Sequence, residues 1–274
     1  MEHTVAIVLA AGQGKRMQST EKKQYMLLQD KPILYYSLRA MEESFIDAVI
    51  LVVNSGEQDF VREEIVSKYH FQKVAAIVSG GEERYHSVAA GLEAAAALPP
   101  VNTEATAAPA PANIEATAAA ALTDIDAGAI PPAWDYCFIH DSARPFVTQE
   151  ILQRALTEVK NSHACVVGMP VKDTIKIADD AGYVAQTPNR SLVWAVQTPQ
   201  VFDFSLALSA YRMLLCQEAE LKDKGVQITD DAMVVETFTD RKVKLVEGSY
   251  TNIKITTPDD LLTATQIQKE QNGN

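Results

Sequence analysis

Residues 5–17 read VAIVLAAGQGKRM, an apolar run that passes into small residues, two glycines and two cations. The run Val5–Leu9 is rich in Val and Ile without alternation, which is typical of a strand covered on both faces. The small residues after it allow the backbone to approach a ligand and to turn N–H groups toward phosphate oxygens. The stretch lacks the third glycine of a GxGxxG motif and the Ser or Thr that follows the lysine of a P-loop. It predicts a strand and an anion-binding turn, with an ordinary glycine turn as the alternative.

Similar apolar runs alternate with helical patterns along most of the chain. The expected strands are Val5–Leu9, Ala48–Val53, Val74–Val78, Tyr136–Ile139 and Ala164–Met169, and the expected helices are Ile33–Met41, Glu57–Tyr69 and Glu83–Ala97. This order predicts an α/β fold with a mostly parallel sheet and helices on both faces. Right-handed crossovers then place a ligand at the carboxyl ends of the strands. We expect residues 1–274 to form a single domain.

Two segments interrupt this alternation. Residues 97–132 are rich in Ala, Pro and Thr, and the prolines break the helix that the alanines favour, so we expect a mobile, solvent-exposed insert. Residues 171–200 are expected to lie outside the parallel sheet. Within them, residues 171–192 alternate apolar and polar side chains on both sides of Asp180-Ala181-Gly182, which predicts a β-hairpin arm. Pairing with a second copy of the chain would cover the exposed face of such an arm.

The remaining part of the chain returns to the alternating order. It predicts a helix near Asp203–Gln217, a short helix, a strand at Val243–Val246 and a final helix with Thr257 as its N-cap. Asp230 and Asp231 open the short helix, and a capped helix start explains them better than a pair of metal ligands.

The balance of charge restricts the partners of this protein. The 274 residues include 24 Lys and Arg against 36 Asp and Glu, a net charge of −12. This balance argues against binding to nucleic acid, which relies on a basic surface. An anionic ligand must therefore be held by a local group of cations, such as the lysines and arginine at positions 15, 16, 22 and 23.

Targeting signals and cysteine usage indicate the compartment. No run approaches the roughly 18–20 apolar residues of a membrane span, and the N-terminus does not resemble a signal peptide. The three cysteines, Cys137, Cys165 and Cys216, lack the spacing of a metal site and are typical of a reducing compartment. We expect a cytoplasmic protein without a membrane partner.

The fourth expected strand ends in His140-Asp141-Ser142-Ala143-Arg144. An Asp just past the carboxyl end of a parallel strand is well placed in a ligand crevice, and a carboxylate suits Mg²⁺ bound to substrate phosphates. A surface turn in which Asp141 pairs with Arg144 is the alternative. His140 has no partner at metal-ligand spacing, so we expect it to pack at the end of the strand.

A second glycine turn, Gly80-Gly81-Glu82-Glu83, links the third expected strand to its helix. Its glycines again permit close backbone approach, and Glu82 and Ser87 could bind a base or a ribose. An ordinary turn followed by a helix start is equally compatible with this stretch. Lys254 is, by itself, one lysine among many.

These stretches together form an ordered set of motifs. The set consists of Ala10-Ala11-Gly12-x-Gly14-x-Arg16-Met17, Lys23-Gln24-Tyr25, Gly80-Gly81-Glu82-x-Arg84-x-x-Ser87, His140-Asp141-x-Ala143-Arg144-Pro145, Val171-Lys172-Asp173-Thr174, Thr198-Pro199-Gln200 and Asn252-Ile253-Lys254. In this order the sequence resembles the 2-C-methyl-D-erythritol 4-phosphate cytidylyltransferases of the non-mevalonate isoprenoid pathway. The resemblance spans nearly the whole chain and fails only in the Ala- and Pro-rich insert.

The resemblance implies a Rossmann-like nucleotide-diphospho-sugar transferase fold, a homodimer joined through the arm at residues 171–192, and transfer of CMP from CTP with Mg²⁺, or another divalent ion such as Mn²⁺. It assigns catalytic roles to Arg16, Lys23, Arg190 and Lys254, nucleotide binding to Ala10, Ala11, Gly12, Gly14, Gly81, Glu82 and Ser87, and substrate binding to Asp141, Arg144, Thr174 and Arg190. Asp141 matches the metal ligand. Glu82 stands where other members often carry Asp.

Two alternatives to this function remain open. A ribitol 5-phosphate or other pentitol phosphate cytidylyltransferase would share the CTP half of the site and differ only in its acceptor pocket. A non-catalytic sensor on the same fold would bind CTP without turnover, although the joint presence of Arg16, Lys23 and Asp141 favours an enzyme.

Overall fold

The structure is a computed structural model that describes residues 2–12, 22–98 and 134–272. Among these residues, seven strands form one sheet in the order β11-β7-β10-β6-β1-β4-β5. The strands are β1 (Thr4–Leu9), β4 (Ala48–Val53), β5 (Val74–Ser79), β6 (Tyr136–Asp141), β7 (Ala164–Pro170), β10 (Trp194–Asp203) and β11 (Lys244–Glu247). Five of them were predicted within a few residues as strands of a parallel sheet, and β11 was predicted as a later strand.

The sheet is mostly parallel, as predicted, because only β10 runs against its neighbours. β1 pairs in parallel with β4 and β6, β4 with β5, and β7 with β11. β10 lies antiparallel between β6 and β7. The parallel strands β1, β4, β5 and β6 therefore end at the same edge of the sheet, where Asp141 closes β6 and residues 10–12, 54, 80–87 and 142–143 follow the strands.

β10 corrects the prediction that residues 171–200 lie outside the sheet, because Trp194–Gln200 belong to a strand inside it. The proline of Thr198-Pro199 hid this strand, since proline cannot donate to a ladder and weakens the prediction of an inner strand. The structure accommodates it where the register between β10 and β7 shifts, between Val196 and Gln200.

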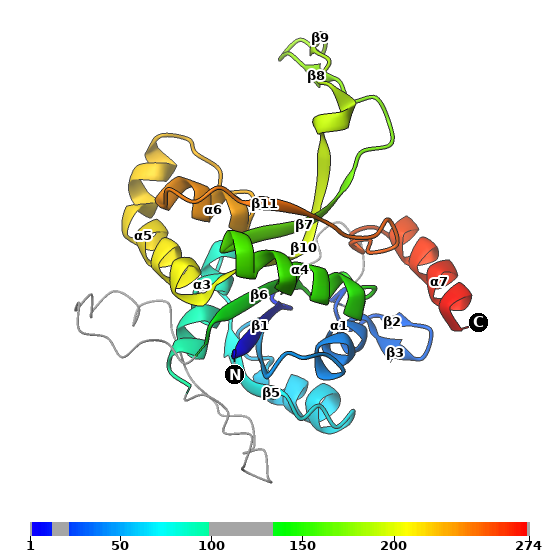
Figure 1. Cartoon of the computed structure of the whole chain (residues 1–274). Coiled ribbons are helices and arrows are strands. Elements are labelled where there is room, and N and C mark those ends of the chain that lie inside the picture. The colour runs from blue at the N-terminus through cyan, green and yellow to red at the C-terminus, as the bar shows by residue number, and fades with distance from the viewer. Residues whose placement is uncertain (1, 13–21, 99–133, 273–274) are drawn as a thin grey trace.

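Helices cover both faces of the sheet, as predicted (Figure 1). The helices are α1 (Ile33–Glu42), α2 (Gln58–Val61, continued by a π-helix over Arg62–Ser67), α3 (Arg84–Ala96), α4 (Gln149–Ser162), α5 (Phe204–Asp223), α6 (Asp231–Phe238) and α7 (Pro258–Asn272). One apolar cluster joins α1, α2 and α4 to one face, and another joins α3, α5 and α6 to the opposite face. No described helix has the length and apolar character needed to cross a membrane.

Helix α4 was not predicted, although Thr148 accepts a hydrogen bond from the Ile151 backbone N–H at 3.4 Å and so caps it. The predicted cap of the last helix is present, since the Asp260 backbone N–H donates to Thr257 Oγ1 at 3.3 Å. Two short strands, β2 (Leu27–Leu28) and β3 (Lys31–Pro32), pair just before α1.

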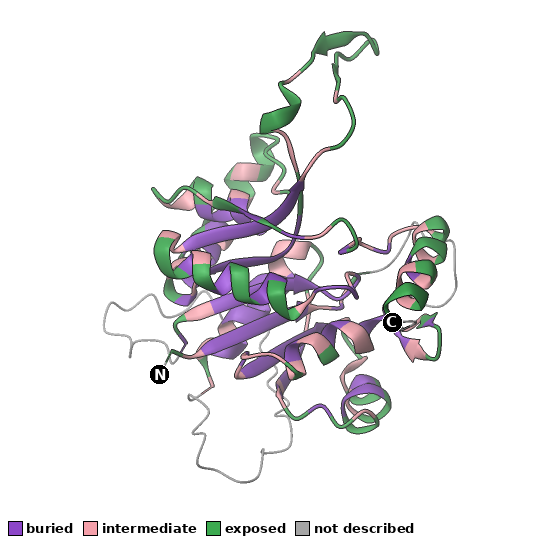
Figure 2. Cartoon of the chain, turned by 45° about the vertical axis from the view of Figure 1, so that its right-hand side comes forward, coloured by how far each residue is buried: buried purple, intermediate pink, exposed green. Residues whose placement is uncertain are grey.

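The predicted hairpin is present within residues 171–192, and it stands out from the sheet (Figure 1). Its strands, β8 (Ile177–Ala178) and β9 (Val184–Gln186), pair antiparallel, and Gly182 takes a φ of +85° in the turn between them. The inner strands of the sheet are buried, whereas the edge strand β11 and the arm are largely exposed (Figure 2). Of the predicted 97–132 insert, all but Ala97 and Leu98 lies outside the described residues.

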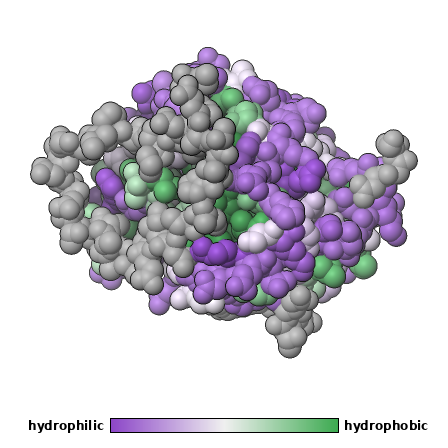
Figure 3. Space-filling model, turned by 90° about the horizontal axis from the view of Figure 1, so that it is seen from below, coloured by the Kyte–Doolittle hydropathy of each residue, from purple (hydrophilic) through white to green (hydrophobic). Residues whose placement is uncertain are grey.

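The surface is unevenly polar. Seen from below, hydrophilic side chains cover much of the molecule and hydrophobic ones gather near the centre of the view (Figure 3). Four large apolar side chains on the arm are also exposed, namely those of Ile177, Tyr183, Val184 and Leu192. These four stand on a segment that projects away from the core, so no described part of the same chain covers them.

Candidate active site

A cleft lies at the carboxyl ends of the parallel strands, where a ligand was predicted. Its lining comes from five parts of the chain: the turn after β1, the turn before β2, the loop after β4, the loop between β5 and α3, and the end of β6, with Lys254 beside them. The lining residues are Leu9, Ala10, Ala11, Gly12, Lys23, Gln24, Asn54, Gly81, Glu82, Glu83, Arg84, Ser87, Asp141, Ser142, Ala143 and Lys254.

Most of the predicted site residues meet in this cleft. Those that line it are Ala10, Ala11, Gly12, Lys23, Gly81, Glu82, Ser87, Asp141 and Lys254. Gly14 and Arg16 lie outside the described residues. The structure thus brings together the described part of the first predicted glycine turn, the second glycine turn, the predicted metal ligand and two of the four predicted catalytic cations. Lys22 lies next to Lys23, but its ammonium pairs with Glu57.

The two turns approach each other so closely that they require small residues. A Cβ atom on Gly80 would lie 2.6 Å from Ala11 Cβ and 2.5 Å from Ser87 Oγ. A Cβ atom on Gly81 would lie 2.4 Å from His86 Cβ. The Gly81 N–H donates to Ser87 Oγ at 3.2 Å. The Ser87 hydroxyl, which was predicted to bind a base or a ribose, therefore also holds the Gly80-Gly81 loop in place.

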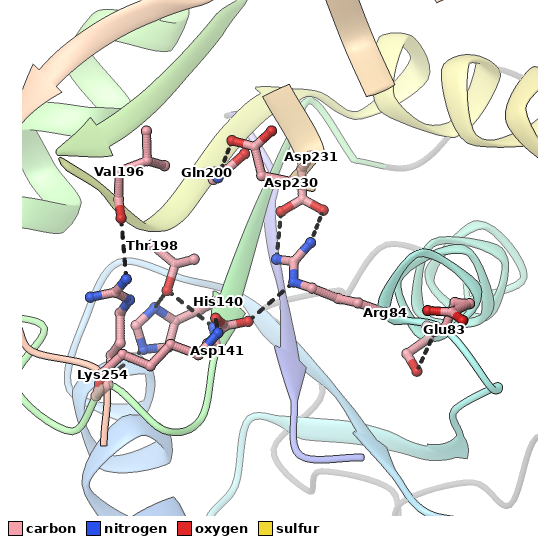
Figure 4. A network of polar contacts seen from close by, with 12 residues as sticks. Glu83, Arg84, His140, Asp141, Val196, Thr198, Gln200, Asp230, Asp231 and Lys254 are labelled. Atoms are coloured by element: carbon pink, nitrogen blue, oxygen red, sulfur yellow. Dashed lines mark hydrogen bonds and ion pairs between the residues drawn. The ribbon is translucent and has the colours of Figure 1, made fainter. Parts of the chain in front are cut away.

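Asp141 lies at the centre of a charged network at the end of β6 (Figure 4). Lys254 Nζ is 2.5 Å from its Oδ2 atom, and Arg84 Nε is 3.4 Å from Oδ1. Burial would raise the pKa of the Asp141 carboxyl, but the charges of Arg84 and Lys254 outweigh it and hold that pKa well below its usual range. The carboxylate is therefore anionic at neutral pH. The alternative of an ion pair with Arg144 is wrong, since these two residues share a backbone hydrogen bond instead.

Arg84 is a site residue to which the sequence analysis gave no role. Its guanidinium donates to both carboxylate oxygens of Asp231, at 2.6 and 2.7 Å, and also faces Asp141 (Figure 4). Burial alone would lower the pKa of Arg84, but the charge of Asp231 raises it well above its usual value. Arg84 stands in a quoted motif, yet its partner is 147 residues away in the sequence. Local patterns could not predict that pairing.

His140 packs at the end of its strand, as predicted. It is fully buried, and its Nδ1 and Nε2 atoms lie 3.0 Å from Thr198 Oγ1 and 3.2 Å from the Arg144 carbonyl oxygen. Burial lowers the pKa of His140 to about 4, so the ring is neutral at physiological pH. The Thr198 hydroxyl also accepts the Asp141 backbone N–H at 3.1 Å. His140 therefore helps to hold the strand end that carries Asp141.

Asp230 and Asp231 open α6 in the way the sequence indicates. Asp230 accepts the Met233 backbone N–H at 3.0 Å, which is an N-cap contact. Asp231 is fully buried and accepts from Arg84 and from the Tyr211 hydroxyl. Among the described residues, no group of three or more His, Cys, Asp or Glu side chains is placed to hold a metal ion.

Three predicted substrate-binding residues do not line the cleft. The Arg144 guanidinium donates to the carbonyl oxygens of Asn252, at 2.8 Å, and Val196, at 3.3 Å. Thr174 and Arg190 are exposed on the arm, where Arg190 Nη1 donates to the Lys172 carbonyl oxygen at 2.9 Å. Within one copy of the chain, the described members of the nucleotide-binding set therefore lie together in the cleft, and the acceptor-binding set is divided between the cleft and the arm.

Comparisons with known proteins indicate the same family as the motifs that form the site. The family model described as 2-C-methyl-D-erythritol 4-phosphate cytidylyltransferase matches residues 4–131 and 115–270. A protein of that name from Lachnoclostridium phytofermentans is 42% identical over 270 residues, which cover 98% of each chain. Another from Alkaliphilus oremlandii is 39% identical and covers 97% of this chain and 95% of its own.

Solved structures agree. The 4-diphosphocytidyl-2C-methyl-D-erythritol synthase of Anaerococcus prevotii superposes with a TM-score of 0.72 at 29% identity, covering 98% of this chain and 96% of its own. The 2-C-methyl-D-erythritol 4-phosphate cytidylyltransferase of Thermus thermophilus gives a TM-score of 0.65 at 26% identity, covering 98% of this chain and all of its own. The α/β nucleotidyltransferase fold, the glycine turns and the charged strand end therefore have one explanation: the chain belongs to the 2-C-methyl-D-erythritol 4-phosphate cytidylyltransferase family.

Proposed function

We propose that this protein transfers CMP from CTP to 2-C-methyl-D-erythritol 4-phosphate, giving 4-diphosphocytidyl-2-C-methyl-D-erythritol and pyrophosphate. The observation that supports this most is the convergence of two small-residue turns with Lys23, Lys254 and Asp141 in one cleft, in a chain of this family. The same convergence argues against a non-catalytic CTP sensor, because such a sensor needs the nucleotide turns but not the charged strand end.

The reaction joins two polyanions, so the protein must neutralise charge and align the reactants. The phosphate of the acceptor attacks the α-phosphorus of CTP, and the bond to the pyrophosphate leaving group breaks. A phosphate monoester has its second pKa at about 6 and is largely ionised at neutral pH, so no general base is required. The neutral, buried ring of His140 agrees with a mechanism that uses none.

The described residues of the cleft have different proposed roles. Residues 10–12 and Gly81 line the cleft, and their small side chains let the phosphates and the nucleoside of CTP approach the backbone. Lys23 supplies charge to the triphosphate and to the transition state, and Arg16 has the same proposed role. Lys254 lies beside Asp141, where its ammonium can neutralise the incoming acceptor.

The donor set fits a magnesium or manganese ion that is held mainly by the substrate. Such an ion commonly takes one or two carboxylates together with substrate phosphates and water. Asp141 offers one carboxylate, which its low pKa keeps anionic. Asp141 would hold the ion, and the bound ion would supply positive charge to the triphosphate of CTP.

The arm supports a homodimer. It carries four exposed apolar side chains, and it also carries Thr174 and Arg190, which do not line the cleft of their own chain. We propose that the arm packs on a second copy, where Thr174 and Arg190 bind the acceptor in the partner's cleft. Arg144 would support this arrangement, because its guanidinium donates to the carbonyl oxygen of Val196 in β10.

We also propose a cytoplasmic location, which the three free cysteines support.

The acceptor assay tests the proposal directly. The purified protein is incubated with CTP, Mg²⁺ and either 2-C-methyl-D-erythritol 4-phosphate or ribitol 5-phosphate, and released pyrophosphate is measured. We expect turnover with the first acceptor and little with the second, since the family match favours methylerythritol phosphate. Faster turnover with ribitol 5-phosphate would show that this compound is the acceptor. CTP binding without turnover would show that the protein is a sensor.

A further inference from the structure

The turn that carries Lys23 into the cleft is held from outside the cleft. Residues 22–26 form this turn, with the Tyr25 N–H donating to the Lys22 carbonyl at 2.9 Å and the Met26 N–H donating to the Lys23 carbonyl at 3.3 Å. The turn joins α1 through the Leu34 N–H, which donates to the Gln24 carbonyl at 3.0 Å. These backbone contacts set the shape of the turn and join it to α1, but none of them connects it to the loop after β4.

The carboxylate of Glu57, in the loop after β4, makes that connection. It accepts from the Lys22 ammonium, from the Tyr25 hydroxyl at 2.8 Å and from Asn54 Nδ2 at 2.9 Å. Burial would raise the pKa of Glu57, but its hydrogen bonds with Lys22, Asn54 and Tyr25 lower it, so the group is an anion. Two of its donors, Lys22 and Tyr25, flank the Lys23-Gln24 pair that lines the cleft.

Glu57 is itself fixed to the sheet. Its N–H donates to the Asn54 carbonyl at 3.1 Å, and its own carbonyl accepts from the Val61 N–H at 2.9 Å, at the start of α2. The Tyr25 ring meets the Phe60 ring edge-on, with centroids 5.1 Å apart. The loop after β4 therefore holds the turn through the Glu57 carboxylate, and α2 holds it through the Phe60 ring, while Asn54 of the same loop lines the cleft.

We propose that Glu57 is a positioning residue for Lys23. This inference rests on the proposed function, in which the Lys23 ammonium supports the phosphates of CTP. Glu57 fixes the residues on either side of the Lys23-Gln24 pair, so the backbone from which the Lys23 side chain extends is held before substrate arrives. Glu57 also keeps the neighbouring ammonium of Lys22 outside the cleft. Displacements of about 1 Å at such sites can cost about 10²-fold in rate.

The substitution Glu57→Gln tests this, because the amide keeps the size of the side chain and loses the charge that binds Lys22. We expect kcat to fall about 10- to 100-fold, with a smaller change in the KM for CTP, because misplacement acts chiefly in the transition state. Tyr25→Phe removes one donor and should reduce kcat by a few fold. Glu64→Gln, which breaks the exposed pair with Lys68, is the matched control and should retain full activity.

A double-mutant cycle with Lys23→Met separates positioning from a general loss of structure. If Glu57 acts through Lys23, then Glu57→Gln has little further effect on kcat in the Lys23→Met protein. An equal reduction in both backgrounds would assign Glu57 a structural role and overturn the proposal, as would full activity of Glu57→Gln. If Glu57→Gln does not fold, the same cycle with Tyr25→Phe decides between these outcomes. Absence of activity in the unmodified protein would instead reject the proposed function itself.

Discussion

Arg84 and Asp231 form a bidentate ion pair, with Nη1 of Arg84 2.6 Å from Oδ1 of Asp231 and Nη2 2.7 Å from Oδ2. The pair joins the first residue of α3 to the first residue of α6. Since Arg84 Nε also faces Asp141 at 3.4 Å, the cation beside the proposed metal ligand is held by a helix that does not line the cleft. The packing of α6 and the electrostatics of the site are thus physically connected.

The first prediction concerns this pair. Asp231 is fully buried, so Asp231→Ala removes the acceptor of Arg84 Nη1 and Nη2 and of the Tyr211 hydroxyl. Removing one partner of a buried pair typically costs about 3–5 kcal/mol. We expect the free energy of unfolding, measured by urea denaturation, to fall by that amount. Glu220→Gln, at an exposed helical pair with Lys224, should leave the unfolding midpoint where it is. Equal midpoints for both variants would show that the buried pair does not stabilise the fold.

The second prediction concerns Asp141. Asp141→Asn keeps the shape of the side chain and removes the negative charge between Lys254 and Arg84. We expect turnover to fall by at least about 10²–10³-fold, the usual effect of removing one preorganised group. The variant should still fold, because Arg84 keeps Asp231, but its melting temperature should be lower, because Lys254 loses its charged partner. Pyrophosphate release and thermal unfolding measure the two effects, and a rate equal to that of the unmodified protein would remove the metal-binding role.

The third prediction concerns pH. The pKa of His140 is about 4 in the fold and about 6.5 in an unfolded chain, so the unfolded state binds an extra proton between these values. The contribution of His140 to stability is complete above pH 6.5 and decreases as the pH falls toward 4, by up to about 1.4 kcal/mol per pH unit. Urea denaturation at pH 7 and pH 5 should therefore show a smaller difference for His140→Gln than for the unmodified protein. His3→Gln should keep the original difference. A pH dependence that His140→Gln leaves unchanged would contradict the assignment.

The sequence predicted those features that local patterns encode. Short apolar runs, several of them continuous and rich in Val and Ile, identified β1, β4, β5, β6 and β7, and their order placed the cleft at the strand ends. β10 was missed because Pro199 interrupts its run. Long-range pairing was also missed: Arg84 meets Asp231, and Lys254 meets Asp141, over more than 100 residues. Which side chains pair depends on how two distant elements pack against each other, and local patterns in a single sequence do not predict that packing.

The fourth prediction concerns the Ala- and Pro-rich segment. Its two ends are held together, since Trp134 is buried and its indole N–H donates to the Ala95 carbonyl at 2.9 Å. Shortening a connection between fixed ends changes the closure free energy only slowly with length. Deleting residues 101–130 should therefore leave kcat and KM within a few fold. Loss of activity in a deletion variant with an unchanged circular dichroism spectrum would show that the segment takes part in the reaction.

The fifth prediction tests the arm by mixing inactive variants. In a homodimer whose arms reach across, a subunit with Lys23→Ala can still lend its Arg190 to a partner that carries Arg190→Ala. Random exchange of subunits gives half heterodimers, each with one complete site of two, so about a quarter of the original activity should return. Mixing Lys23→Ala with Lys254→Ala is the matched control. Both of these residues line one cleft, so no complete site can form and no activity should return. If the first mixture stays as inactive as the second although subunits exchange, Arg190 does not act in the partner's cleft.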